Sequence, residues 1–167
     1  SFVRVTGIDS LRNPITYGLL DIFMGRIVVH IFGKPKDKNL AAIITDYSNR
    51  ISSRGMTVKL YPDKKSPDNY EKKLINLNGD LIILDENGIQ KTSRELSELV
   101  LQVSLSDETV NFAIGPPDGF SDKLKNKVVK KISLSKMTFL HEMAASILLE
   151  QLYRATEIIR GSPYHRK

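Results

Sequence analysis

Short apolar runs alternate with longer amphipathic segments over most of the chain. Runs rich in β-branched residues predict buried strands at residues 26–32, 56–61, 80–84, 110–114 and 128–133. Apolar residues three and four apart predict helices at 39–53, 69–77, 92–105 and from about 138 to 160, with a short basic helix after residue 119. This alternation predicts an α/β domain whose mostly parallel sheet has helices on both faces.

Two helix ends carry clear sequence signals. Thr92 is followed three residues later by Glu95, which is the spacing of a capping box at a helix N-terminus. Gly161 and Pro163 follow the last amphipathic segment and predict its end near Arg160.

Three loops follow predicted strands, at residues 85–91, 115–120 and 134–140. Ligands of parallel α/β sheets bind at the carboxyl ends of strands, so these loops are where we expect any chemistry. The first reads as a simple turn with Gly88 at positive φ. The second lacks both the G-x-G-x-x-G and the G-x-x-x-x-G-K spacings, which excludes a dinucleotide or nucleoside-triphosphate site of those kinds.

The length of 167 residues suits one domain, and the absence of cysteine excludes disulfides, thiolate zinc sites and cysteine nucleophiles. The formal net charge of +6 suits an RNA or an acidic membrane surface, or simply a lysine-rich soluble surface. Residues 123–136 hold six lysines and no acid, and the last fourteen residues hold four cations against Glu157 alone. This clustering favours RNA.

Residues 1–23 stand apart from the alternating pattern. Asp9, Arg12 and Pro14 interrupt their apolar stretches, which argues against a secretory signal. Met24 could be a natural start, so we expect an N-terminal extension of unknown role, genuine or artefactual, and one domain at 24–167. The apolar stretches are too short to span a bilayer, so no membrane partner is expected.

The three histidines, His30, His141 and His165, lack the spacing of metal ligands on one helix, and no metal site is predicted. His30 is expected to be structural, and His141 to pack or cap the last helix. His165 lies in a polar tail with Tyr164 and Arg166, which either frays or stacks on a base and binds phosphate. The apolar stripe of the last helix predicts a core or a dimer face.

Three segments near the C-terminus resemble the signature of the RlmH family of methyltransferases: SLSKMTFLH at 133–141, EQLYRA at 150–155 and RGSPYHR at 160–166. Earlier pieces match in order, namely Gly33-Lys34, Leu84-Asp85 with Gly88, and Phe112-x-Ile114-Gly115 with Gly119. The resemblance covers residues 24–167. One departure is Pro116, where the family has a second glycine; proline removes an amide donor and fixes φ, which would weaken a ligand contact that needed either.

This resemblance implies a knotted α/β (SPOUT) fold with a C-terminal trefoil knot, and a homodimer. It implies methylation of the N3 of a pseudouridine in large-subunit ribosomal RNA, reached in the assembled ribosome, with S-adenosylmethionine as the methyl donor. The implied cofactor contacts are Leu84, Gly115, Leu134, Ser135, Lys136, Met137, Thr138 and Phe139.

The chemistry of this implied reaction makes residues of the tail, and of the helix before it, the candidates for catalysis. His165 would remove the N3 proton, Arg154 and Arg166 would stabilise the anion or anchor phosphates, and Tyr164 would stack on the base or hydrogen-bond to it. We expect the tail of one protomer to complete the pocket of the other.

Two alternatives stay open at this point. Pro116 motivates a knotted RNA-binding or ribosome-docking protein with weak or retargeted methyltransferase activity. A basic non-enzymatic docking module would lack a cofactor pocket altogether. The expected compartment is the cytoplasm, or an organelle if residues 1–23 are the remnant of a targeting segment.

Overall fold

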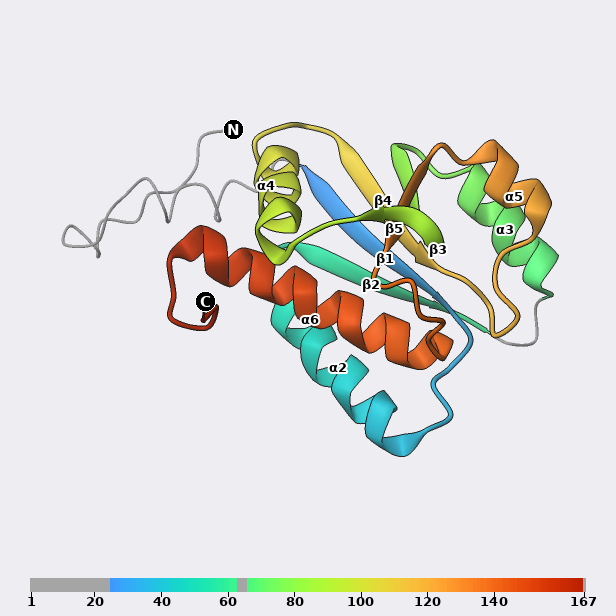
Figure 1. The fold of residues 1–167 in the computed structure, drawn as a ribbon, viewed down its shortest axis with the longest axis horizontal. Helices are drawn as coiled ribbons and strands as arrows, with labels where there is room; N and C mark the ends of the chain where they lie inside the picture. Colours follow the sequence, from blue (N-terminus) through green and yellow to red (C-terminus); the bar gives the residue numbers. More distant parts are fainter. Residues whose placement is uncertain (1–24, 63–65, 167) are drawn as a thin grey trace.

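The computed structural model describes residues 25–62 and 66–166, so the predicted extension at 1–23 lies outside the described residues (Figure 1). The elements in chain order are β1 (Arg26–Phe32), α2 (Lys38–Ser52), β2 (Met56–Tyr61), α3 (Pro67–Ile75), β3 (Asp80–Gln90), α4 (Ser93–Ser104), β4 (Thr109–Ile114), α5 (Asp122–Lys127), β5 (Lys130–Ser133) and α6 (His141–Arg160). They form a parallel sheet in the order β2-β1-β4-β3-β5, which confirms the predicted α/β class.

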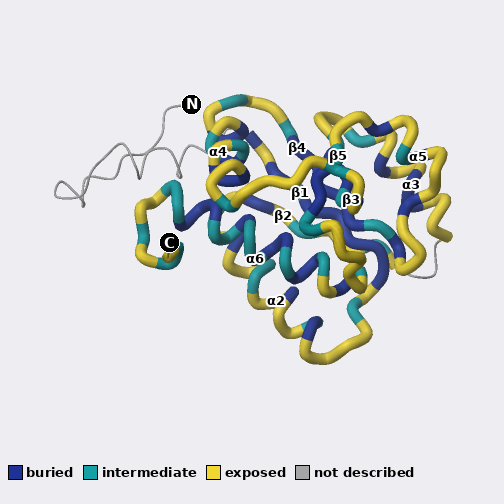
Figure 2. The backbone as a smooth tube through the Cα atoms, viewed as in Figure 1, coloured by how far each residue is buried: buried dark blue, intermediate teal, exposed yellow. Residues whose placement is uncertain are grey.

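Helices cover both faces of the sheet. Alternate residues of β1, such as Ile27 and Val29, pack with α2, α4 and α6, while Phe32 packs on the other face with Tyr70 of α3 and Leu124 of α5. Figure 1 shows α6 beside α2 on one side and α3 beside α5 on the other. In Figure 2 the central strands β1 and β4 are largely buried between these two layers, as expected of a parallel sheet.

The predicted capping box is present at the start of α4. The Thr92 hydroxyl accepts from the Glu95 N–H at 3.1 Å, and the Thr92 N–H donates to Glu95 Oε2 at 2.7 Å. Gly161 ends α6 with a left-handed φ of 69°, as its position predicted. The predicted start of α6 near residue 138 was early, because residues 134–140 form a loop and the helix begins at His141.

The prediction that residues 85–91 form a loop was wrong, because β3 continues to Gln90. Leu84 and Ile89 both pair with Ile132 of β5, so the residues between them form a bulge within the strand. Gly88 does not adopt a positive φ, contrary to expectation. A glycine is required there for another reason: a Cβ would lie 2.7 Å from the carbonyl carbon of Lys131.

His30 is fully buried between the sheet and α3, in keeping with the structural role predicted for it. Its Nδ1 lies 2.7 Å from the Tyr61 hydroxyl and its Nε2 lies 2.9 Å from Asn111 Oδ1. A neutral ring protonated on Nε2 satisfies both partners. Burial lowers the pKa of His30, and the nearby Lys59 lowers it further against the opposing hydrogen bond of Asn111.

Candidate functional site

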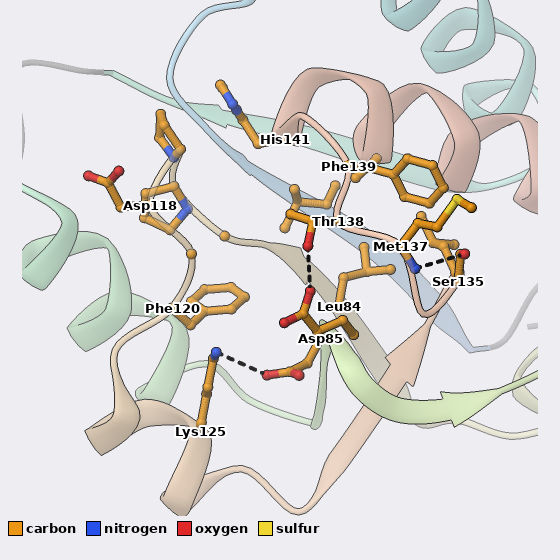
Figure 3. Close-up of a pocket in the computed structure, with 18 residues that line it drawn as sticks. Leu84, Asp85, Asp118, Phe120, Lys125, Ser135, Met137, Thr138, Phe139 and His141 are labelled. Atoms are coloured by element: carbon orange, nitrogen blue, oxygen red, sulfur yellow. Dashed lines mark hydrogen bonds and ion pairs between the residues drawn. The ribbon is translucent and has the colours of Figure 1, made fainter.

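A pocket of about 310 Å³ lies at the carboxyl ends of β4 and β5 and beside the bulge in the middle of β3 (Figure 3). The three loops predicted to carry chemistry supply most of its wall, and the start of α6 closes it with His141 and Ala144. Its size is at the lower end of the range for small-molecule sites in proteins. The position agrees with the rule that parallel sheets bind ligands beyond their strand ends.

Most of the residues that the resemblance implied as cofactor contacts meet in this pocket. Those lining it are Leu84, Gly115, Leu134, Ser135, Met137, Thr138 and Phe139. Lys136 is exposed and is not part of the lining. The middle of β3 and the loops after β4 and β5 therefore bring together residues that are up to 55 positions apart in the sequence.

The second loop folds as a tight turn around Gly115. The Gly119 N–H donates to the Pro116 carbonyl at 2.7 Å, and Gly119 has a φ of 80°. Pro117 takes the second position of this turn, which proline favours. A Cβ on Gly115 would lie 3.2 Å from the Phe120 nitrogen, so the turn closes tightly onto this glycine. Pro116 is buried in the pocket wall and brings no N–H donor to it.

The third loop is joined to the bulge of β3 across the pocket. The Thr138 hydroxyl donates to Glu86 Oε2 at 2.8 Å (Figure 3). Within the loop, the Met137 N–H donates to the Ser135 hydroxyl at 3.0 Å, and the Ser133 hydroxyl donates to the Ser135 carbonyl at 2.8 Å. These three hydrogen bonds restrain the conformation of the loop.

The pocket carries charges that sequence reasoning did not assign. Asp85 is buried, accepts from the Asn87 N–H at 2.8 Å and forms an ion pair with Lys125 at 3.4 Å. Burial alone would raise the pKa of Asp85, but the Asn87 N–H and the Lys125 ammonium outweigh it and leave the pKa below its usual value. Glu86 and Asp118 add two further carboxylates to the lining. No local pattern marks Lys125, because only the packing of α5 brings it to Asp85.

His141 also belongs to this site, although its sequence position predicted only packing or capping. It lines the pocket, and among the described residues its Nδ1 is one of two buried side-chain nitrogens without a hydrogen-bond partner. A buried polar atom of this kind is unfavourable unless a ligand satisfies it. The described residues contain no group of three or more His, Cys, Asp or Glu able to hold a metal ion.

The predicted catalytic residues form a second cluster at the other end of α6. Arg154 donates to Glu150 Oε1 through Nη2 at 2.7 Å, and the Tyr164 hydroxyl donates to the same oxygen at 3.1 Å. His165 Nδ1 lies 3.4 Å from Arg154 Nη1. Burial raises the pKa of Tyr164, and the Tyr47 hydroxyl and Glu150 raise it further, so Tyr164 stays a protonated donor. Arg166 is exposed beyond them.

One chain does not bring the two clusters together. Ala144 lines the pocket and Arg154 lies ten residues further along the helix, a separation of about 15 Å at ~1.5 Å per residue. Figure 1 shows the C-terminal tail at the far end of α6 from its start.

The fold and the pocket define a parallel α/β domain with a ligand site at the strand ends and without a phosphate-binding glycine motif. Residues 25–165 match the family described as "Predicted SPOUT methyltransferase", and the chain belongs to that family. It is 34% identical over 156 residues to the ribosomal RNA large subunit methyltransferase H of Malacoplasma penetrans, covering 84% of this chain and 99% of that protein. It is 36% identical over 151 residues to the protein of the same name from Clostridium botulinum, covering 80% and 95%.

Solved structures show a weaker likeness. The SpoU methyltransferase AviRb from Streptomyces viridochromogenes, determined in complex with AdoMet, matches with a TM-score of 0.46 at 14% identity, covering 78% of this chain and 58% of that one. A likeness at this level supports no argument about the site.

Proposed function

We propose that this chain is an S-adenosylmethionine-dependent methyltransferase that methylates the N3 of a pseudouridine in large-subunit ribosomal RNA. The observation that carries the proposal is the pocket itself. Seven of the eight residues expected to contact the cofactor line it, in a chain of the SPOUT methyltransferase family. The relatives from Malacoplasma penetrans and Clostridium botulinum, which this chain matches over 99% and 95% of their length, carry the name ribosomal RNA large subunit methyltransferase H. The trefoil knot of such folds stays a prediction.

The residues of the pocket fit this cofactor. S-Adenosylmethionine is cationic at sulfur and at its amino group, and Asp85, Glu86 and Asp118 give the lining an excess of carboxylates. Leu84 and Phe139 offer apolar contacts suited to an adenine ring, and the unpartnered His141 Nδ1 offers a polar contact. When bound, the cofactor supplies an activated methyl group.

The residues of the tail cluster suit the acceptor nitrogen. The N3 of a neutral pseudouridine carries a proton, so it needs a base before it can attack a methyl group. His165 is the candidate base, because histidine is the side chain that most often removes protons in enzymes. Arg154, oriented by Glu150, and the exposed Arg166 are candidates to stabilise the anion or to anchor phosphates. Tyr164 keeps its proton and is a candidate donor to the base.

We further propose a homodimer in which the tail of one protomer completes the pocket of the other. The separation of about 15 Å along α6 supports this, because a chain's own tail lies far from its own pocket. Apolar side chains at and beside the pocket rim support it as well. Met137 is 74% exposed, Leu140 60% and Met143 41%, an arrangement typical of an interface.

Complementation tests this arrangement. A His165→Ala variant and a pocket-filling Gly115→Val variant should each be inactive, yet mixing them should restore about a quarter of wild-type activity. If subunits exchange at random, about half of the dimers contain one copy of each variant, and each of these dimers has one intact composite site out of two. If the tail served its own pocket, the mixture would stay inactive.

The first experiment on the function itself is isothermal titration with S-adenosylmethionine. Binding at about one site per protomer or per dimer, followed by methylation of purified bacterial ribosomes, supports the proposal. His165→Ala should abolish turnover and leave cofactor binding nearly intact; an active variant would contradict the assignment of the base. If the folded protein bound no S-adenosylmethionine, that result would contradict the proposal that the chain is a methyltransferase.

The second candidate is a ribosome-docking protein of the same fold with weak or retargeted activity. Pro116 favours it, because the pocket wall lacks an N–H donor at this residue. A Pro116→Gly variant with much tighter cofactor binding than the wild type would support this candidate. Either candidate is expected to act where ribosomes are, in the cytoplasm. No helix of the described residues is long and apolar enough to cross a membrane.

A further inference from the structure

Lys125 is the one lysine or arginine among the described residues that line the proposed cofactor pocket. Three carboxylates share the lining with it, those of Asp85, Glu86 and Asp118. Figure 3 shows Lys125 next to Asp85, on the opposite side of the pocket from Phe139. The pocket therefore has a charged side near α5 and an apolar side near the loop before α6.

The short helix α5 holds Lys125 in this place. Leu124, the residue before it, is fully buried in the cluster that contains Tyr70 of α3. Ser121, at the N-cap of α5, donates to the buried Glu71 through its backbone N–H at 2.7 Å and through its hydroxyl at 2.6 Å. The backbone that carries Lys125 is therefore fixed to the core, and its side chain has a defined origin at the pocket wall.

Asp85 takes only part of the hydrogen-bonding capacity of Lys125. Its Oδ2 lies 3.4 Å from Lys125 Nζ, while its Oδ1 accepts from the Asn87 N–H at 2.8 Å. A lysine ammonium carries three N–H donors, and within the described part of the chain Asp85 is its one ion-pair partner. The side chain of Lys125 is 35% exposed and that of Asp85 only 3%. The ammonium is thus the accessible member of the pair and can receive a second carboxylate.

The proposed cofactor brings such a group. S-Adenosylmethionine has one anionic group, the carboxylate of its methionine end, beside the cationic sulfonium and ammonium. Moving a carboxylate out of water is unfavourable unless a cation or N–H donors receive it. His141 is the other nitrogen-bearing side chain on the wall, but its Nε2 lies 4.0 Å from Glu142 Oε1, and this carboxylate would repel a second anion. Lys125 is free of that repulsion on its accessible side.

We propose that Lys125 binds the carboxylate at the methionine end of the cofactor, with Asp85 as the residue that positions the ammonium. This inference rests on the proposed function for the identity of the cofactor. The Asn87 N–H and the Lys125 ammonium hold the pKa of Asp85 below its usual value, so Asp85 is ionised at neutral pH and keeps Lys125 in place. Lys125 then selects for ligands that retain the carboxylate.

A pair of ligands that differ in this carboxylate isolates the contact. Decarboxylated S-adenosylmethionine keeps the adenosine, the sulfonium and the amino group and lacks only the carboxylate. Isothermal titration gives the dissociation constants of both compounds for the wild type, Lys125→Gln and Lys125→Arg. The matched control is Lys127→Gln, which removes the same charge from an exposed residue of the same helix outside the pocket lining.

A hydrogen bond between charged groups at a partly exposed position contributes about tenfold to affinity. The wild type should therefore prefer S-adenosylmethionine to the decarboxylated compound by about tenfold. Lys125→Gln should bind S-adenosylmethionine about tenfold more weakly, and the decarboxylated compound as tightly as the wild type or more tightly, because a cation that repels it is gone. Lys125→Arg should keep most of the preference, since arginine also pairs with carboxylates, and Lys127→Gln should follow the wild type.

Equal losses for the two compounds in Lys125→Gln would overturn the inference, because Lys125 would then act only on the shape of the pocket. The same losses in Lys127→Gln would overturn it as well. A wild type without the preference would overturn it with no variant needed. If the preference is found but purified bacterial ribosomes are not methylated, the proposed function fails and the role of Lys125 stands. If ribosomes are methylated and Lys125→Gln binds both compounds as the wild type does, only the role of Lys125 fails.

Discussion

Replacement of Gly88 by alanine tests how the sheet shapes the proposed cofactor pocket. The added Cβ would lie 2.7 Å from the carbonyl carbon of Lys131 and 2.8 Å from the backbone nitrogen of Ile132. Carbon contacts are favourable at about 3.5 Å or more, so β5 must move away from β3 by about 0.8 Å. Both atoms belong to backbone, which cannot rotate aside as a flexible side chain could.

The expected effects follow from the place of β5 in the sheet. It is an edge strand that pairs with β3, and the loop at 134–140 follows it directly. Overpacking of this kind destabilises a protein by about 1–3 kcal/mol. Movement of β5 also displaces the loop that lines the pocket, and we expect the affinity for S-adenosylmethionine to fall about tenfold, equivalent to ~1.4 kcal/mol. Urea denaturation and isothermal titration measure the two quantities.

Gly161→Ala is the matched control. Gly161 has a φ of 69°, and an added Cβ would meet nothing within 4 Å. The left-handed conformation alone should destabilise this variant by about 1 kcal/mol. Because Gly161 precedes tail residues that are proposed to act on the RNA base and not to contact the cofactor, cofactor affinity should be unchanged. Equal cofactor affinities for the two variants, or a Gly88→Ala variant as stable as the wild type, would refute the argument.

Three further predictions concern single contacts. Tyr47→Phe keeps the ring but removes the hydroxyl group that lies 3.2 Å from the Tyr164 hydroxyl. Turnover should fall about fivefold, which corresponds to the loss of ~1 kcal/mol, and cofactor affinity should be unchanged. An unaltered turnover rate would contradict a role of Tyr47 in positioning the tail. Thr138→Val removes the bond to Glu86 and should weaken cofactor binding about fivefold by titration; tighter binding would contradict a preformed loop. Burial lowers the pKa of His30 below 6.5, so the stabilising effect of its neutral form is complete above that pH and is lost as the pH falls below it. The melting temperature should drop on acidification, and His30→Gln should reduce that drop; an identical profile would contradict the assignment.

The sequence predicts the central strands β1 and β4 well because their apolar runs are buried on both sides of a parallel sheet. Predictions failed where the determinant was a contact between distant residues. The extension of β3 through residues 85–90 depends on β5 pairing with it across a bulge, and the local sequence Asp85-Glu86-Asn87-Gly88 looks like a turn. Gly88 is required there because the backbone of β5 approaches it closely, and not because it adopts a positive φ.

The candidate site was predictable to the same extent. The ends of the predicted strands indicated the three segments that supply most of the pocket wall, and the family resemblance indicated particular residues in or beside those segments. Lys125 and His141 were not assigned, because no spacing in the sequence shows that α5 and the start of α6 converge on Asp85 and the turn at Gly115. Tyr47 was missed in the same way, since its contact to Tyr164 spans 117 positions.

The packing of α2 against α6 holds the pocket, near the start of α6, and the tail cluster of Arg154, Tyr164 and His165, near its end, at a fixed distance from each other within one chain. Near its start, α6 is joined to the chain before α2 by Glu142, which accepts from the N–H groups of Lys36 and Asp37. Near its end, Glu157 accepts from Arg54 at 2.8 Å in a largely buried ion pair. Because both ends of the helix are fixed to the same neighbour, the distance between a chain's own pocket and its own tail cannot shorten without breaking buried contacts. A composite site between two copies therefore requires no rearrangement within either chain, whereas a site within one chain requires the loss of this packing.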